Sequence, residues 1–347
     1  MNTKTIDLAN IALMIISCAA AYLLPFELFL FSYAVLGPLH YLTEISWLHK
    51  RDYFATGRRD YLVFIPIAIV ITFLMIFDAS SDGSRWSTNL IFICFVGAFG
   101  MVFHRGWMEK LILLCASFIL GLLLSRYQGF QLMFGMYLPT LVHVFIFTGL
   151  FIIYGALKNK SLTGAASVVV FVVCGVSFFL YRPIMNWYHV SDQTMQNIRV
   201  VKFDYLVYSL MGMLHMDIKT YHTIEQMIFR SVPGQSVMRF IAFAYTYHYL
   251  NWFSKTSIIK WHKVPRRWLA LVLVAWVASV ALYAVDYMLG LEMLFLLSML
   301  HVFFEFPLNY RSVVGIAEEL GLKIPTPAPA LATPGATPTP RKEKKRK

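Results

Sequence analysis

Long hydrophobic runs separated by short polar loops recur along nearly the whole chain. Runs such as YLVFIPIAIVITFLMIF (61–77) and WLALVLVAWVASVALYAV (268–285) approach the roughly 20 apolar residues that a helix needs to cross a membrane. The pattern predicts an all-α, polytopic helical bundle of about ten transmembrane helices within residues 1–323. The predicted spans are 6–23, 26–48, 60–78, 87–104, 109–126, 133–156, 163–181, 236–254, 267–286 and 290–309.

Composition and charge agree with a protein solvated by lipid. Of the 347 residues 59% are hydrophobic and only 14% charged, too few to cover a surface in water. The net charge of +12 lies in short loops such as 50–59, 104–110 and 255–267, and in the tail 341–347. If the N-terminus is cytoplasmic, all of the strongly basic loops lie on the cytoplasmic side, so the charge pattern predicts cytoplasmic termini in a bacterial inner (cytoplasmic) membrane. The partner that we expect is the lipid bilayer rather than nucleic acid.

Two segments lie outside this scheme. Residues 182–235 follow the seventh span and contain FDYLVYSLMGMLHM (203–216), which is apolar but short for a span, so we expect an outer or re-entrant segment. Residues 324–347 form a Pro/Ala/Thr-rich basic tail that we expect to be disordered. Nothing in the pattern indicates an oligomeric state.

Four histidines lie deep in four even-numbered spans, which all run from outside to inside in the predicted topology. They precede the next basic residue by seven to 15 positions, which places them roughly 10–22 Å from the cytoplasmic helix ends. One layer of the membrane could therefore contain all of them. These histidines are His40, His143, His248 and His301.

Polar neighbours make a metal site the favoured interpretation. Glu44 and Glu305 each follow a histidine by four residues, and Asn251 shares the face of His248. Imidazole binds iron, copper or zinc, and a nearby carboxylate can ligate the metal or orient a ring. We predict the four histidines as ligands, with Glu44, Glu305 and Asn251 in supporting or catalytic positions. A lone membrane histidine often only bonds to a neighbouring helix, and proton relays use the same residue types.

Two other features of the sequence carry weaker expectations. Pro307, after His301, is a position where the last span could bend. The patch 215–225 contains His215 and His222, and a polar surface explains both. If this patch entered the membrane, His215 would become a further candidate ligand.

The four histidine segments, taken in order, resemble the Brp/Blh family of membrane-bound β-carotene 15,15′-dioxygenases. The segments are GPLHYLTE (37–44), HVFIFT (143–148), YHYLNW (247–252) and LHVFFEFPLN (300–309). The chain departs from the family pattern in having a leucine between Pro38 and His40 and one histidine where the third segment has a pair. The resemblance implies non-haem Fe(II) held by histidines, O2 as co-substrate, and cleavage of a carotenoid to retinal.

The sequence thus predicts a membrane-embedded, histidine-ligated iron oxygenase that acts on a carotenoid or a similar long apolar lipid. One alternative is another lipid oxidoreductase, such as a hydroxylase or a desaturase-like di-metal enzyme, although the dense HxxxH and HxxHH boxes typical of those enzymes are absent. The other alternative is a transporter that uses the histidines and carboxylates for protons or ions.

Overall fold

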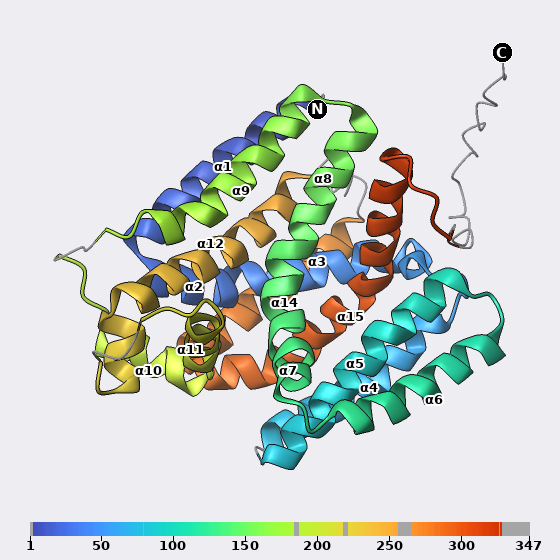
Figure 1. Ribbon diagram of the computed structural model, residues 1–347, viewed down its shortest axis with the longest axis horizontal. Coiled ribbons are helices and arrows are strands. Elements are labelled where there is room, and N and C mark those ends of the chain that lie inside the picture. The colour runs from blue at the N-terminus through green and yellow to red at the C-terminus, as the bar shows by residue number, and fades with distance from the viewer. Residues whose placement is uncertain are drawn as a thin grey trace.

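The chain forms a bundle of long helices (Figure 1). The computed structural model describes residues 3–78, 80–183, 187–217, 221–255, 265–325 and 327. All regular secondary structure within these ranges is helical, which confirms the all-α prediction. The basic loop 255–267 and the tail 324–347 lie largely outside the described residues.

Nine helices of the described part are long and apolar enough to cross a membrane, and they match nine of the ten predicted spans. Several consist of consecutive helical pieces, because π or 3-10 segments interrupt the α geometry. The nine are α1 (Thr3–Leu23), α2–η1–α3 (Pro25–Phe31, Ser32–Leu36, Gly37–His49), η3–α4 (Asp60–Val63, Phe64–Phe77), α5 (Ser81–Phe103), α6 (Trp107–Leu124), α7–η4–α8 (Gln128–Phe130, Gln131–Phe147, Thr148–Asn159), α9 (Leu162–Leu180), α14 (Arg266–Val285) and α15 (Tyr287–Glu319).

The tenth predicted span, 236–254, is helix α12 (Val232–Ser254), which falls outside that apolar set. Its sequence carries Arg239, His248 and Asn251, which lower its mean hydropathy. Most of its side chains are buried, and α1, α2 and α9 pack around it. A polar helix is tolerated at such a position because protein rather than lipid surrounds it.

Helix α15 is longer than expected. The predicted span ends at residue 309, but the helix continues without a break past Pro307 to Glu319. Pro307 therefore does not end the helix, although its ring removes one backbone donor, and the first and last parts of α15 run in different directions (Figure 1). Its 33 residues extend about 50 Å, beyond the roughly 30 Å of a hydrocarbon core.

The segment after the seventh span folds into short helices at one end of the bundle (Figure 1). These are α10 (Asp192–Val200), α11 (Phe203–Met213) and the π-turn η5 (Gln226–Arg230). Helix α11 is about 16 Å long, too short to cross a membrane, and packs against α12. His215 and His222 are exposed in this segment, away from the other histidines.

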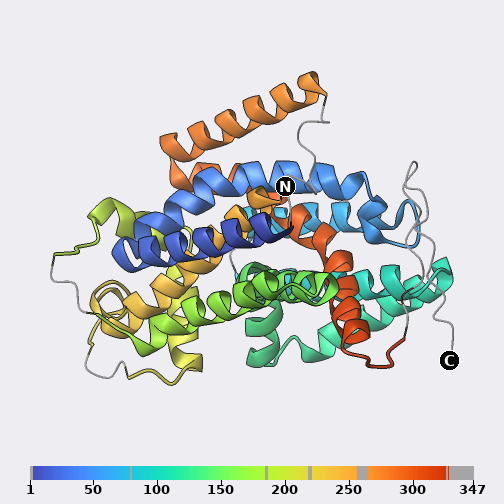
Figure 2. The ribbon, with the colours of Figure 1, turned by 90° about the horizontal axis from the view of Figure 1, so that it is seen from above.

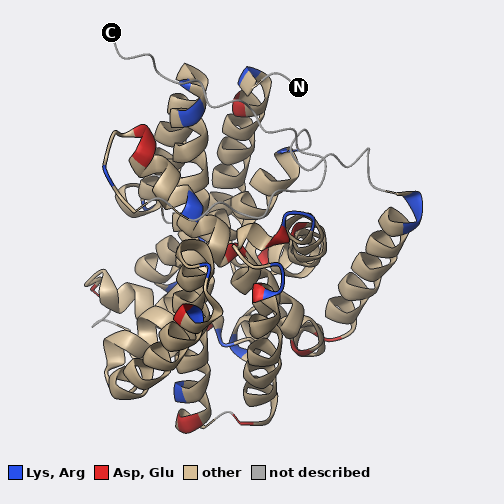
Figure 3. Cartoon of the chain, turned by 90° about the vertical axis from the view of Figure 1, so that its right-hand side faces the viewer, with Lys and Arg blue, Asp and Glu red and all other residues tan. Residues whose placement is uncertain are grey.

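The surface of the bundle is that of a membrane protein. Along the long helices most residues are uncharged, and the charged ones lie mainly at helix ends and in loops (Figure 3). Helix α14 lies at the periphery (Figure 2), with only 17% of its apolar window buried, and α6 is similar at 11%. The start of α1, the α8–α9 turn and the end of α15 lie at the same end of the bundle (Figure 1).

Candidate metal centre

The four intramembrane histidines meet in the centre of the bundle, although each comes from a different helix. His40 is on α3, His143 on η4, His248 on α12 and His301 on α15. All four are buried, with exposed fractions between 1% and 5%. The two carboxylates are equally hidden, Glu44 at 3% and Glu305 at 1%. The four histidines therefore lie at a common depth, as predicted. Together with the two glutamates they form a polar cluster inside a hydrophobic interior.

Unusual helix geometry places two of the histidines. The π-turn η1 directly precedes α3 and His40, and η4, which carries His143, is π-helical over 17 residues. Pro139 lies inside η4 and has no backbone N–H to offer to the preceding turn. π-Helical turns are rare and are frequent at functional sites, because they shift the facing of the side chains that follow.

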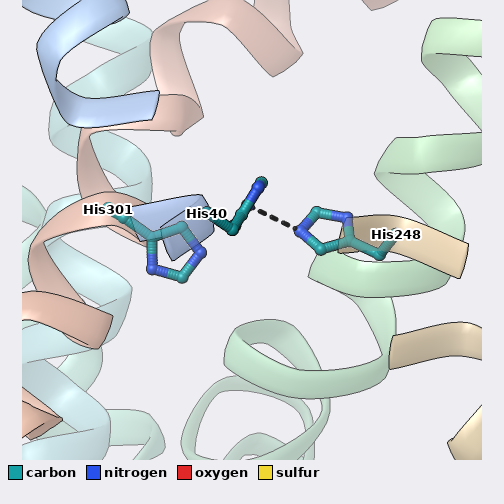
Figure 4. Close-up of side chains that lie close together, drawn as sticks. All are labelled: His40, His248 and His301. Carbon is teal, nitrogen blue, oxygen red and sulfur yellow. Dashed lines mark hydrogen bonds between the residues drawn. The ribbon is translucent and has the colours of Figure 1, made fainter. Parts of the chain in front are cut away.

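The imidazole nitrogens face one another across the site. His40 Nε2 lies 3.1 Å from His248 Nε2, and His143 Nε2 lies 3.0 Å from His301 Nε2. Donor atoms of His40, His248 and His301 all lie within 4.8 Å of one another, so this group could hold a metal ion. Figure 4 shows these three rings converging from separate helices. His143 lies beside the group, next to His301.

Contacts on the other side of the rings orient two of them. The Nδ1 of His301 bonds to the Ser298 carbonyl oxygen, and the Nδ1 of His248 lies 2.8 Å from the Thr148 hydroxyl. A carbonyl only accepts, so we assign the proton of His301 to Nδ1, which leaves a lone pair on Nε2. That lone pair faces His143 Nε2 at 3.0 Å.

The two glutamates differ in how they approach the histidines. Glu44 Oε2 lies 2.9 Å from His40 Nε2, the pair expected from the four-residue spacing. Glu305 was expected beside His301, but its Oε2 lies 3.2 Å from His143 Nδ1 on the neighbouring helix. The Nδ1 of His301 is already bonded to the Ser298 carbonyl oxygen. Tertiary packing brings η4, with His143, against α15. Neither of these oxygens has a hydrogen-bond partner of good geometry, so both are buried and unsatisfied.

Asn251 lies apart from the rings. It is buried and lines a second cavity of about 270 Å³, together with Asp7, Asn10 and Lys255. Burial lowers the pKa of Lys255, while the charges of Glu44 and Glu305 act in the opposite direction. Asn251 forms part of this flanking polar region, and its predicted catalytic role stays a prediction.

Several residues around the rings were not among the predicted site residues. The ring of Tyr41 stacks on His301 with centroids 4.2 Å apart, and its hydroxyl bonds to that of Tyr249 at 3.1 Å. The Trp252 indole donates to Thr43 at 2.9 Å, beside His40. Tyr41, Thr43, Tyr249 and Trp252 flank His40 and His248 in the sequence. Their adjacency was the available signal, but aromatic residues in a membrane helix usually have other roles.

The donor set fits a divalent transition metal. With metal–nitrogen bonds of ~2.1 Å, ligands at right angles lie about 3.0 Å apart and tetrahedral ligands about 3.4 Å apart. The two Nε2–Nε2 distances, 3.0 Å and 3.1 Å, are of this size. A cation would also use the His301 lone pair and the unsatisfied oxygen of Glu44. The residues present therefore fit a bound metal.

A cavity of about 370 Å³ leads from this centre toward one end of the bundle. His143, His301, Tyr41 and Tyr249 form its inner end. Its outer end is formed by residues of the α4–α5 turn and by Lys202, which are partly or fully exposed. A molecule in the cavity would thus contact the histidine rings directly.

Comparison with known proteins gives no relative for this chain. No protein-family model matches it, and no curated protein or solved structure is significantly similar to it.

Proposed function

We propose that this protein is a membrane-embedded, non-haem iron oxygenase that acts on a long apolar lipid. The buried three-histidine group and the long apolar helices are compatible with a membrane metalloenzyme. The single observation that carries the proposal is the meeting of His40, His248 and His301, of which His301 lines the inner end of a cavity. Cleavage of β-carotene to retinal is the activity that the Brp/Blh resemblance adds.

The chain's own residues would have distinct tasks. His40, His248 and His301 would hold the ion, with His143 and Glu44 as the adjacent donors. A bound Fe(II) would supply the activation of O2 beside the substrate. Thr148 and Ser298 fix the orientation of two rings, and Glu305 faces the third. The buried surroundings keep bulk water away from the reacting atoms.

The oxygenase reaction balances without a further reductant. Cleavage of one carbon–carbon double bond by O2 forms two carbonyl groups, one oxygen atom going to each carbon. Both bonds of the alkene are broken, and its four electrons reduce the two oxygen atoms. The enzyme then needs only to bind the alkene beside the metal and to exclude water. The cavity wall of Val144 and Val302 beside the histidines suits an apolar chain.

Metal analysis of the purified protein tests this proposal. We expect about one iron per chain, lost in His248→Ala and His301→Ala but retained in His104→Ala. His104 is a suitable control because it is exposed and pairs with Glu109 at the end of a helix. An iron-free protein with intact histidines would contradict the proposal. Bleaching of a carotenoid-producing host, with release of retinal, tests the carotenoid activity separately.

A transporter is the second candidate, and one observation favours it. The cavity at Asn251 and Lys255 opens near the α8–α9 turn, whereas the cavity at the histidines opens at the α4–α5 turn, at the other end of the bundle (Figure 1). A transporter needs a path to its central site from each side of the membrane, and these two cavities lie on opposite sides of the polar centre. Uptake of protons or metal ions into proteoliposomes, without bound iron, would support this reading instead.

A further inference from the structure

The cavity that ends at the histidines changes character along its length. Its outer end carries Asp78, Ser80, Ser84 and Ser87, and Lys202 lies there as well. Its middle is apolar and is lined by Ile71, Leu74, Met75, Ile91, Leu291 and Phe295. Its inner end reaches His143 and His301. A pure hydrocarbon would leave the polar outer end without partners, which disfavours it as the occupant.

The depth of the cavity can be measured along two helices. Its lining extends from Ser80 to Ile91 along α5 and from Leu291 to Val302 along α15, a separation of eleven positions in each case. Eleven helical residues rise about 16 Å. An extended alkyl chain advances ~1.3 Å per carbon at a bond length of ~1.5 Å, so on the order of 12 carbons cover this depth. The volume of about 370 Å³ suits one such chain rather than two.

The outer end of the cavity carries one anion, Asp78, and one cation, Lys202, and the cation offers a site to a partner. Asp78 keeps its negative charge, which the Ser80 backbone amide stabilises by donating to Oδ1 at 3.1 Å. Lys202 is exposed, and its ammonium makes no ion pair within the described part of the chain. The serine hydroxyls add further donors. A free cation beside hydroxyl donors matches a carboxylate or phosphate.

We propose that the cavity binds a single-chain lipid with an anionic head group, its head at Lys202 and its chain end at the histidines. This inference rests on the proposed iron oxygenase and names its substrate class as an anionic single-chain lipid in place of β-carotene, which is a pure hydrocarbon. The reacting carbons would lie roughly 12 atoms from the head. The lipid would enter from the end of the bundle that carries the α4–α5 turn, rather than sideways between helices.

Photo-cross-linking maps the orientation of such a lipid. Two dodecanoic acid probes are used, one with a diazirine at the terminal carbon and one with a diazirine near the carboxylate. We expect the terminal probe to label residues 297–302 and the other probe to label 80–87 and 201–203, as read by mass spectrometry. Equal labelling of the lipid-facing helices α6 and α14 by both probes would overturn the proposal.

Affinity measurements test the head group. Dodecanoate, dodecyl phosphate and dodecanol are compared on the protein and on Lys202→Gln, which removes the charge. We expect the variant to bind the preferred anion about fivefold more weakly and dodecanol unchanged. Tighter binding of dodecanoate assigns a carboxylate head, and tighter binding of dodecyl phosphate assigns a phosphate head. Binding of dodecanol as tight as that of both anions would overturn the anionic head.

Plugging the cavity supplies an independent variant. Ser84→Trp places a large ring at the exposed outer end, and we expect it to abolish specific labelling at 297–302. Ser125→Trp, at the end of α6 and outside the cavity, is the matched control and keeps the labelling. The cross-linking is done with metal-free protein. Retained labelling without iron binding would therefore count against the oxygenase alone, and iron binding without labelling against the lipid alone.

Discussion

The hydroxyl of Thr148 is the contact that decides the orientation of His248. It lies 2.8 Å from Nδ1, and no other partner of that nitrogen is present among the described residues. Thr148→Val keeps the shape of the side chain but removes this bond. We expect iron affinity to fall about 10–100-fold, as is typical when the partner of a metal-binding histidine is lost. Chelator competition on the purified protein measures the change.

The control for this substitution is Thr72→Val. The Thr72 hydroxyl bonds only to the Ala68 carbonyl of its own helix and is far from the histidines in the sequence. This variant is therefore expected to bind iron as the unaltered protein does. Equal affinities for Thr148→Val and Thr72→Val would show that Thr148 does not orient the ring.

The two glutamates lie on different sides of the histidine rings. Glu44 Oε2 faces the nitrogen of His40 that also faces His248, whereas Glu305 lies behind His143. We expect Glu44→Gln to weaken iron binding more than Glu305→Gln, because only Glu44 reaches the donor side of a ring. Isothermal titration of the two variants with Fe(II) under anaerobic conditions gives the order. A larger loss for Glu305→Gln would reverse the assignment.

The limits of sequence reasoning are also visible in single residues. The four histidines and Glu44 could be found because spacing along one helix is local. The partner of Glu305 could not, since it depends on η4 packing against α15. Thr148 and Ser298 were equally hidden, because a hydroxyl or carbonyl near an imidazole has no pattern in one dimension.

Elements were easier to predict than their ends, because about 20 apolar residues are a strong signal for a span. Helix α12 shows where a rule based on hydropathy alone fails. Its polar residues lower its mean hydropathy, although most of its side chains are buried inside the bundle. The π-helical geometry of η4 could not be predicted, because Pro139 is the one residue in this segment that indicates an irregular helix. The predicted end of the last span at residue 309 was too early, because the helix continues past Pro307 to Glu319.

Close helix packing leads to a prediction for Gly290 on α15. A Cβ at this position would lie 2.5 Å from ring atoms of Tyr283 and 2.9 Å from its Cα on α14. Gly290→Ala therefore has to push the two helices apart, and we expect a loss of about 1–3 kcal/mol in stability. A thermal melt in detergent, followed by circular dichroism, measures it.

Gly155→Ala on α8 is the matched control for this prediction. No atom lies within 4 Å of the Cβ that it would add, and alanine favours a helix over glycine by about 1 kcal/mol. We expect a melting temperature that is unchanged or slightly higher. A melting temperature lowered as much as in Gly290→Ala would mean that the effect comes from the helices themselves and not from their contact.

At the scale of the whole molecule, the distribution of charge predicts the orientation in the membrane, and the orientation decides on which side each cavity opens. The predicted topology places the basic loops and both termini in the cytoplasm. The start of α1, the α8–α9 turn and the end of α15 share one end of the bundle, and the α4–α5 turn lies at the other (Figure 1). If the charge rule holds, the cavity that reaches the histidines opens on the outer side, and the cavity at Lys255 on the cytoplasmic side.

Cysteine labelling in intact cells tests this orientation. Ser81→Cys and Asn159→Cys are made in a Cys115→Ser background, because Cys115 is an exposed native thiol. A membrane-impermeant maleimide is expected to label Ser81→Cys in intact cells, and Asn159→Cys only after permeabilisation, since both positions are exposed at opposite ends. The reverse pattern would mean that the basic loops face outward. The substrate would then reach the histidines from the cytoplasm.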